Sequence, residues 1–130
     1  MQGEINNRIR AKQLRDYSSL RFGNITPTDI DGLIEYHGKG YVVLELKLRD
    51  AQLQYGQKLA LERLTDDLQR AGKLTLCIIA SHQCDNPEMD IEAGNSIVTE
   101  YRFKGIWRIP NHEYSVKDLI MLFLERKELT

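Results

Sequence analysis

Cysteine, tryptophan and proline are scarce in this chain of 130 residues, which contains two cysteines, one tryptophan and three prolines. Cys77 and Cys84 are too few for a disulfide framework, and their spacing matches no zinc-ligand pair. A hydrophobic core must therefore hold the fold together, and a reducing compartment is the expected setting. The length suits one such core, so we expect a single domain over residues 1–130.

A dominant charge of one sign and a long apolar run are also missing. The 18 basic and 19 acidic residues give a formal net charge of −1, without the polybasic character of many nucleic-acid binders. No apolar run approaches membrane-spanning length, and the first residues, MQGEINNRIRAKQL, are polar and basic where a signal peptide is apolar. We therefore expect a soluble cytoplasmic protein that has no membrane partner.

Positive charge is nevertheless concentrated near the start of the sequence. Between Ile5 and Leu20 apolar residues recur at roughly helical spacing among charged ones, which predicts a first helix lying on a core. Basic side chains here would contact a nucleic-acid backbone and give affinity without sequence selectivity. The residues expected in this role are Arg8, Arg10, Lys12 and Arg15, together with Lys58 further along the chain.

The remaining elements follow from periodicity and turn residues. Two β-rich runs, Ile30 to Tyr36 and Gly40 to Leu48, are separated by a short glycine-containing connection that predicts a hairpin. The order α-β-β-α-β-β-α then predicts an α/β fold with a mixed central β-sheet flanked by helices. Its later elements are a helix over Leu53 to Ala71, an interior strand over Leu74 to Ala80, strands over Ile97 to Phe103 and Trp107 to Ile109, and a terminal helix opened by a capping box at Ser115 to Asp118.

Acidic residues gather at one end of the predicted hairpin. Alternation places Glu45 and Lys47 on one face of the second strand, and Asp29 and Asp31 on one face of the first. Pairing of the strands would bring these groups together, and neighbouring carboxylates repel unless a proton or a cation lies between them. Mg²⁺ or Mn²⁺ suits such oxygen ligands, and its bound water can be activated to attack a phosphate.

A half-buried edge strand with a solvated Glu-x-Lys face is the ordinary alternative. Three features favour a functional site instead. The consecutive apolar residues 42–44 indicate an interior strand, where an idle Glu and Lys would be costly. Gly32 leaves space beside Asp31. The second helix begins with Gln57 and Lys58 close to the end of the Glu-Leu-Lys strand.

These residues resemble the motif of the PD-(D/E)XK nuclease superfamily. The resemblance implies a restriction-endonuclease-like fold, built on an α-β-β-β-α-β core around a mixed sheet. It further implies that Asp31 and Glu45 are metal ligands, that Lys47 is the catalytic lysine, and that Gln57 is the helix glutamine of the exonuclease-like branch. Glu4 corresponds to the acidic residue that some members carry on the first helix.

The match departs from the family pattern at two positions. Proline does not directly precede the aspartate but stands at Pro27, so Asp29 competes with Asp31 for the ligand role. Leu61 occupies the place where an aromatic residue is often found. The resemblance implies a small exonuclease- or resolvase-like enzyme of the kind that occurs in phages and mobile elements. Such enzymes often form homodimers, and the leucine-rich terminal helix is a candidate dimer face, with core packing as its ordinary alternative.

The sequence thus predicts a Mg²⁺- or Mn²⁺-dependent nuclease that hydrolyses phosphodiester bonds in nucleic acid, with DNA favoured over RNA and the choice between them left open. Asp31, Glu45 and the assisting Asp29 would hold the metal, while Lys47 and Gln57 would complete the catalytic set. Two alternatives stay open: a non-catalytic nucleic-acid-binding module on the same fold, and a protein-interaction domain. Metal-dependent cleavage separates the first reading from both others.

Overall fold

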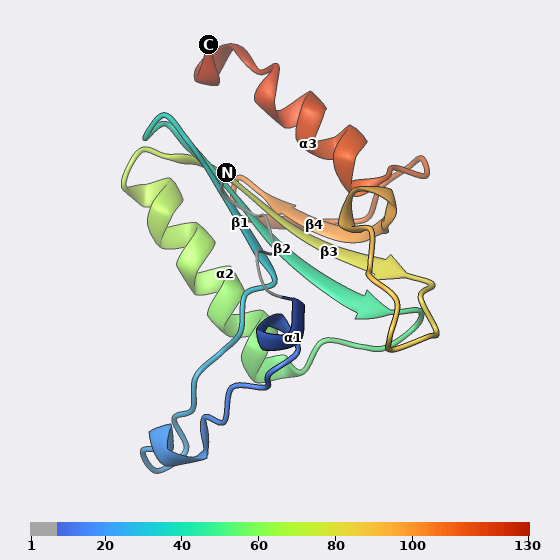
Figure 1. Cartoon of the computed structure of the whole chain (residues 1–130). Helices are drawn as coiled ribbons and strands as arrows, with labels where there is room; N and C mark the ends of the chain where they lie inside the picture. Colours follow the sequence, from blue (N-terminus) through green and yellow to red (C-terminus); the bar gives the residue numbers. More distant parts are fainter. Residues whose placement is uncertain (1–7) are drawn as a thin grey trace.

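The computed structural model describes residues 8–130, in which one five-stranded mixed sheet lies between the helices α2 and α3 (Figure 1). The strands follow one another across the sheet in chain order, and β2 and β3 are parallel while the other neighbouring pairs are antiparallel. The predicted α/β class is confirmed. The strand bounds are β1 Gly32–Tyr36, β2 Gly40–Leu48, β3 Leu74–His82, β4 Ile97–Phe103 and β5 Ile106–Arg108.

The predicted hairpin is confirmed, but its first strand is shorter than expected. His37 and Gly38 have φ values of 52° and 67°, as the two central residues of a type I′ turn require. β1 begins only at Gly32, so Asp29 and Asp31 precede the strand and do not share one of its faces. Beyond the last β1 pair, the Leu46 N–H donates to Asp31 Oδ2 at 2.7 Å, so a side chain takes over where strand pairing ends.

The helix α2, Tyr55–Arg70, connects β2 to the parallel strand β3. Gly72, with φ of 86°, follows its C-terminus, and the N–H of Lys73 donates to the carbonyl of Leu68 at 3.0 Å, as in a Schellman motif. β3 lies between β2 and β4 and is buried from Leu74 to Ala80, as the apolar run predicts. These two elements form a parallel crossover that carries the chain from the end of β2 back to the sheet.

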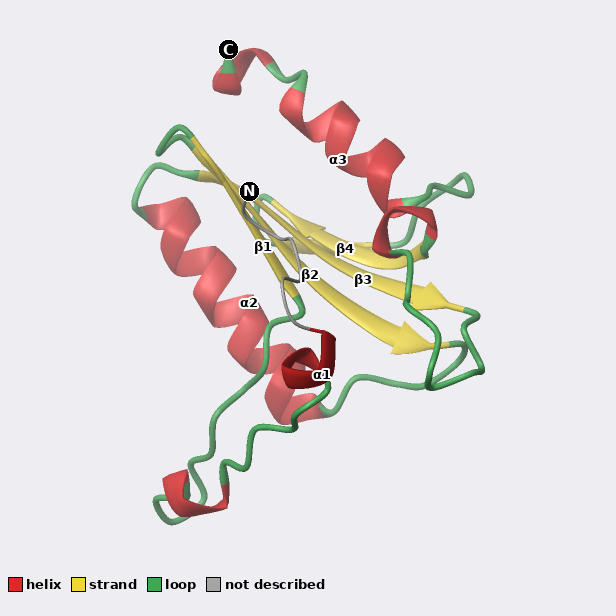
Figure 2. Ribbon diagram, viewed as in Figure 1, coloured by secondary structure: helices red, strands yellow, loops and turns green. Residues whose placement is uncertain are grey.

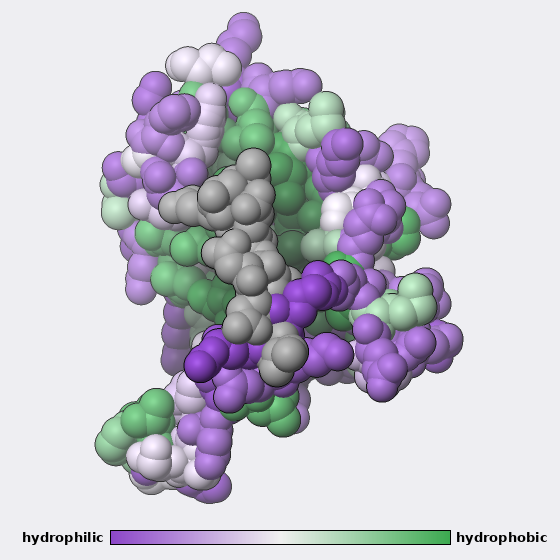
Figure 3. Space-filling view, viewed as in Figure 1, coloured by the Kyte–Doolittle hydropathy of each residue, from purple (hydrophilic) through white to green (hydrophobic). Residues whose placement is uncertain are grey.

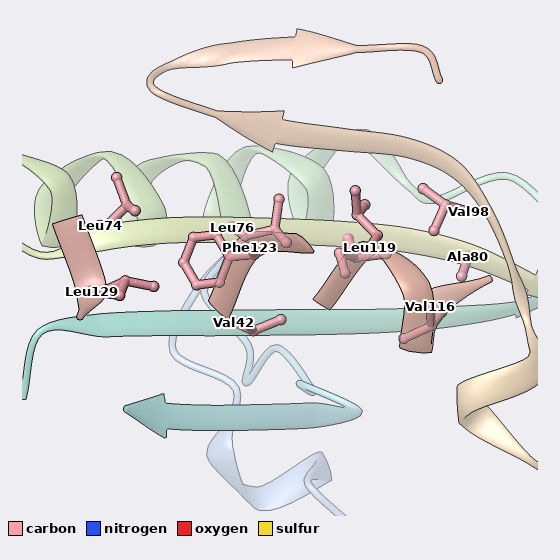
Figure 4. Packing of buried hydrophobic residues seen from close by; sticks show 10 residues of the cluster. Val42, Leu74, Leu76, Ala80, Val98, Val116, Leu119, Phe123 and Leu129 are labelled. Carbon is pink, nitrogen blue, oxygen red and sulfur yellow. The ribbon is translucent and has the colours of Figure 1, made fainter. Parts of the chain in front are cut away.

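The third helix, α3 (Val116–Leu124), covers the opposite face of the sheet from α2 (Figure 2). The predicted N-terminal cap is confirmed, because Ser115 Oγ accepts a hydrogen bond from the Asp118 N–H at 3.1 Å. Figure 4 shows the apolar side chains that fill the space between α3 and the strands. This cluster contains Val42, Leu74, Leu76, Ile78, Ala80, Val98, Val116, Leu119, Phe123 and Leu129.

The first predicted helix is wrong over most of its length. α1 covers only Arg8–Ala11, and after an irregular stretch a short 3₁₀ helix, η1, covers Ser18–Leu20. The expected start at Ile5, like Glu4, lies outside the described residues. Leu14 is 96% exposed, so no core supports a helix here, and short helices depend on such packing. Residues 12–30 instead project from the body of the molecule (Figure 1), and we refer to them as the arm.

Within residues 8–130 two strands precede α2, whereas the nuclease core implied by the resemblance has three strands there. The crossover from the Glu-Leu-Lys strand through α2 to a parallel strand is present. None of the helices in the described part of the chain is long and apolar enough to span a membrane.

Candidate active site at the start of helix α2

Glu45 lies at the centre of the candidate site, on the face of β2 that α2 covers. Its side chain is buried, with 3% of the residue exposed. Gln57, in the first turns of α2, donates from Nε2 to Glu45 Oε1 at 2.9 Å, and Lys47 Nζ lies 3.6 Å from the same oxygen. Strand alternation and the β2–α2 connection therefore bring together three of the residues predicted from the sequence.

The second carboxylate oxygen of Glu45 is buried without a partner. Within the described residues no donor reaches Oε2. A buried polar atom that lacks a hydrogen bond costs about 1–3 kcal/mol, and more when the group is charged. Gln57 and Lys47 both engage Oε1, so Oε2 remains as the oxygen that an additional ligand would satisfy.

Asp31 is the second carboxyl group of the site. One of its oxygens, Oδ2, accepts the Leu46 N–H, and the group lies close enough to Glu45 to affect its ionisation. The pKa of Glu45 is raised, first by burial and then by the charge of Asp31, against the opposing effects of Lys47 and Gln57. Either a proton or a cation would relieve this repulsion.

Asp29, the third proposed metal ligand, does not join this pair. In residues 8–130 no group of three or more His, Cys, Asp or Glu side chains could hold a metal ion. Asp29 is exposed and lines a pocket of about 620 Å³ between the arm and α2, which Gln57 and Arg63 also line. The residues that could hold a hard divalent cation are thus Asp31 and Glu45 through Oε2, and water would have to supply the other ligands.

A second pocket, of about 330 Å³, lies beside Lys47. The Lys47 side chain is 26% exposed and lines this pocket, and its Nζ lies 3.6 Å from the buried Glu45 carboxylate. The ammonium group therefore lies between the carboxylate and the pocket. Arg49, Lys58 and Glu100 also line the pocket.

The basic residues predicted to bind nucleic acid are spread out and partly engaged. Lys58 Nζ lies 2.7 Å from Glu100 and 4.7 Å from the centroid of the Trp107 ring, so its charge is balanced within the protein. Arg8 donates to both carboxylate oxygens of Asp90 at 2.6 Å. On α1 and the arm, the exposed side chains of this set also include Arg10, Lys12 and Arg15.

Sequence reasoning missed an ionic network that joins α2 to β4 and β5. Arg102 donates two hydrogen bonds of 2.9 Å to Asp66, and Trp107 Nε1 donates to Glu62 at 2.8 Å. The Arg102 hydrogen bond lowers the pKa of Asp66. The sequence signal that could have indicated this network is the pair of acidic residues four positions apart on α2, Glu62 and Asp66, together with the basic Arg102 on β4. Burial raises the pKa of the nearby Cys77 thiol to about 12, which makes that thiol a poor nucleophile.

No protein-family model, curated protein or solved structure matches this chain.

Proposed function

We propose that this protein is a Mg²⁺- or Mn²⁺-dependent nuclease with a restriction-endonuclease-like fold that hydrolyses phosphodiester bonds, in DNA rather than RNA. One observation carries the proposal: the buried Glu45 carboxylate lies beside Asp31, its Oε1 is 3.6 Å from Lys47 Nζ, and its Oε2 has no partner among the described residues. A protein that needed only stability would gain by replacing such a group with an apolar one.

Each residue of the site has a different role in the proposed reaction. Asp31 and Glu45 would hold the cation, which when bound supplies an acidified water and neutralises phosphate charge. Gln57 fixes the orientation of Glu45 through Oε1, and the unpartnered Oε2 would be available to hold a cation. Lys47, at the border of the open pocket, stabilises the negative charge that develops on the phosphate during attack.

The surfaces next to the site suit a nucleic-acid strand. The pocket beside Lys47 lies on one side of the start of α2, and the pocket lined by Asp29, Gln57 and Arg63 involves the arm. In this arrangement Asp29 assists from the pocket between the arm and α2, and Lys12 and Arg15 on the arm contact the phosphate backbone. Lys58 joins them only when it leaves Glu100.

The proposal is tested by cleavage of labelled duplex, single-stranded, circular and four-way-junction DNA and of RNA, each with Mg²⁺, Mn²⁺ or EDTA. Wild type is compared with Glu45→Gln and Lys47→Met, and the exposed Glu113→Gln and Lys117→Met serve as matched controls. We expect metal-dependent cleavage that each site variant reduces on the order of 100-fold or more, as loss of transition-state charge stabilisation does. The controls should cleave like wild type.

Two other outcomes would replace this proposal. Salt-sensitive binding of nucleic acid that needs no metal, without cleavage under any condition, would indicate a non-catalytic binding module. Absence of both binding and cleavage would favour a protein-interaction domain.

A further inference from the structure

The arm and the strand that follows it expose several large apolar side chains. Phe22 is 65% exposed and Leu33 is 60% exposed, whereas the core residues of the sheet are at most 9% exposed. Figure 3 shows apolar surface at the tip of the arm, separate from the main body of the molecule. The exposed series comprises Leu14, Tyr17, Leu20, Phe22, Ile25, Ile30, Leu33 and Ile34.

The surface summed over all 130 residues, which include residues 1–7 outside the described part, is larger than that of a compact monomer. It amounts to 9631 Å², whereas a compact monomer of 15.1 kDa exposes about 7,100 Å². The surplus is roughly a third of the expected value. It exceeds the roughly 800 Å² that each partner buries in a standard stable interface. The projecting arm is where the molecule departs most visibly from a compact outline (Figure 2).

The strand β1 supplies a second binding feature next to the arm. It is the edge strand of the sheet, and nothing in residues 8–130 pairs with its outer side. Its sequence, GLIEY, contains neither lysine nor proline, the residues that commonly protect an exposed edge. An exposed edge strand of this kind can pair in antiparallel fashion with an identical strand, since a twofold axis makes the same patch self-complementary.

We propose that a second copy of this chain covers this surface, with the two β1 edges paired antiparallel and each arm packed on the partner. The arm leads directly into β1, so each copy supplies both an apolar arm and, on the α2 face of its edge strand, the exposed Leu33 that receives its partner's arm. A twofold dimer of this form covers both features with one interface, and it satisfies the unpaired backbone groups of β1. The inference is independent of the proposed nuclease activity.

The first test is the mass of the full chain in solution, measured by sedimentation equilibrium. Wild type should have twice the 15.1 kDa of the monomer. Phe22→Ser with Ile25→Ser, and separately Leu33→Lys, should weaken the dimer at least tenfold. Met89→Ser and Ile109→Ser change apolar residues that are 64% and 83% exposed elsewhere, and they should leave the dimer intact. Circular dichroism should give folded spectra for all variants, because every altered side chain is exposed.

A crosslink tests which surface is used. Ile34 is the central residue of β1, so it would lie nearest the twofold axis of the proposed dimer. Ile34→Cys in a Cys84→Ser background should therefore form a covalent dimer under mild oxidation. Met89→Cys in the same background should not. A wild-type chain that stays monomeric up to about 100 μM, far above the Kd of a stable interface, would overturn the proposal. So would a dimer that neither the arm nor the edge variants weaken.

Discussion

The face of the sheet under α3 is packed with apolar side chains, whereas the face under α2 buries ionisable groups among its apolar residues. In the part of the chain that the structure describes, the α3 face buries apolar residues such as Phe123, Leu119 and Ile78, and the one buried acidic or basic side chain, Glu45, lies on the α2 face. On the α2 face Glu45 is buried beside Asp31, and Arg102 is held by Asp66. The contrast indicates that the α3 face supplies stability, while the α2 face carries groups whose placement costs stability and calls for a functional reason.

The largest expected loss in the free energy of unfolding comes from a substitution on the α3 face. Phe123→Ala removes an aromatic ring that is 4% exposed and packs edge-on against Phe103. We expect a loss of about 4 kcal/mol in the free energy of unfolding, as for other buried phenylalanines. Urea denaturation measures it, with Met121→Ala, an exposed position on the same helix, as the control. Equal effects of the two substitutions would contradict the assignment of this face as the core.

An intermediate effect is expected from the ionic network on the α2 face. Arg102→Ala leaves Asp66 and Glu62 without their cation, and breaking such a half-buried pair costs about 3 kcal/mol. Arg70→Ala, which removes an exposed ion pair with Asp67, should cost about 0.5 kcal/mol or less.

This loss should depend on pH in a defined direction. The pKa of Asp66 is lowered in the folded state, so the pair contributes stability above the unfolded value of 3.8 and loses it as pH falls through the folded value. The difference in unfolding free energy between wild type and Arg102→Ala should therefore shrink in strong acid. A difference that stays constant from neutral pH into strong acid would mean that Arg102 stabilises by packing alone.

The smallest expected effect is an increase, and not a decrease, in the free energy of unfolding. Glu45 has a raised pKa when folded, so metal-free wild type should lose stability as pH rises from about 4.5 through the folded value. Glu45→Gln keeps the shape of the side chain and removes that charge. It should make the metal-free protein more stable at neutral pH by about 1 kcal/mol, measured by urea denaturation in EDTA. A destabilised variant would show that the ionised carboxylate is already satisfied by Lys47 and Gln57.

Much of the fold could be predicted because its signals are local. The turn at His37 and Gly38, the C-terminal Gly72 of α2 and the cap at Ser115 each act within a few residues of the backbone they shape. The helix predicted over Ile5 to Leu20 failed because periodicity alone does not show whether a core is present to receive it. The start of β1 was missed because the Asp31 side chain, rather than backbone, accepts the Leu46 N–H.

The candidate site could be predicted in part for a similar reason. Alternation along β2 and the position of Gln57 in the next helix brought Glu45, Lys47 and Gln57 together, as the structure has them. The unpartnered Oε2 was beyond sequence reasoning, because the burial of one side-chain atom depends on tertiary packing that no local pattern encodes. The contact between Glu62 and Trp107 joins residues 45 positions apart, so no local pattern identifies it.

Calorimetric titration of the protein with Mg²⁺ and Mn²⁺ at neutral pH, in wild type and Glu45→Gln, tests the central claim most directly. We expect saturable binding to wild type with a matching rise in Tm, and loss of both in Glu45→Gln, because the cation relieves the repulsion between Asp31 and Glu45. Equal binding by the two proteins, or no binding by wild type, would contradict the assignment of Glu45 as a metal ligand.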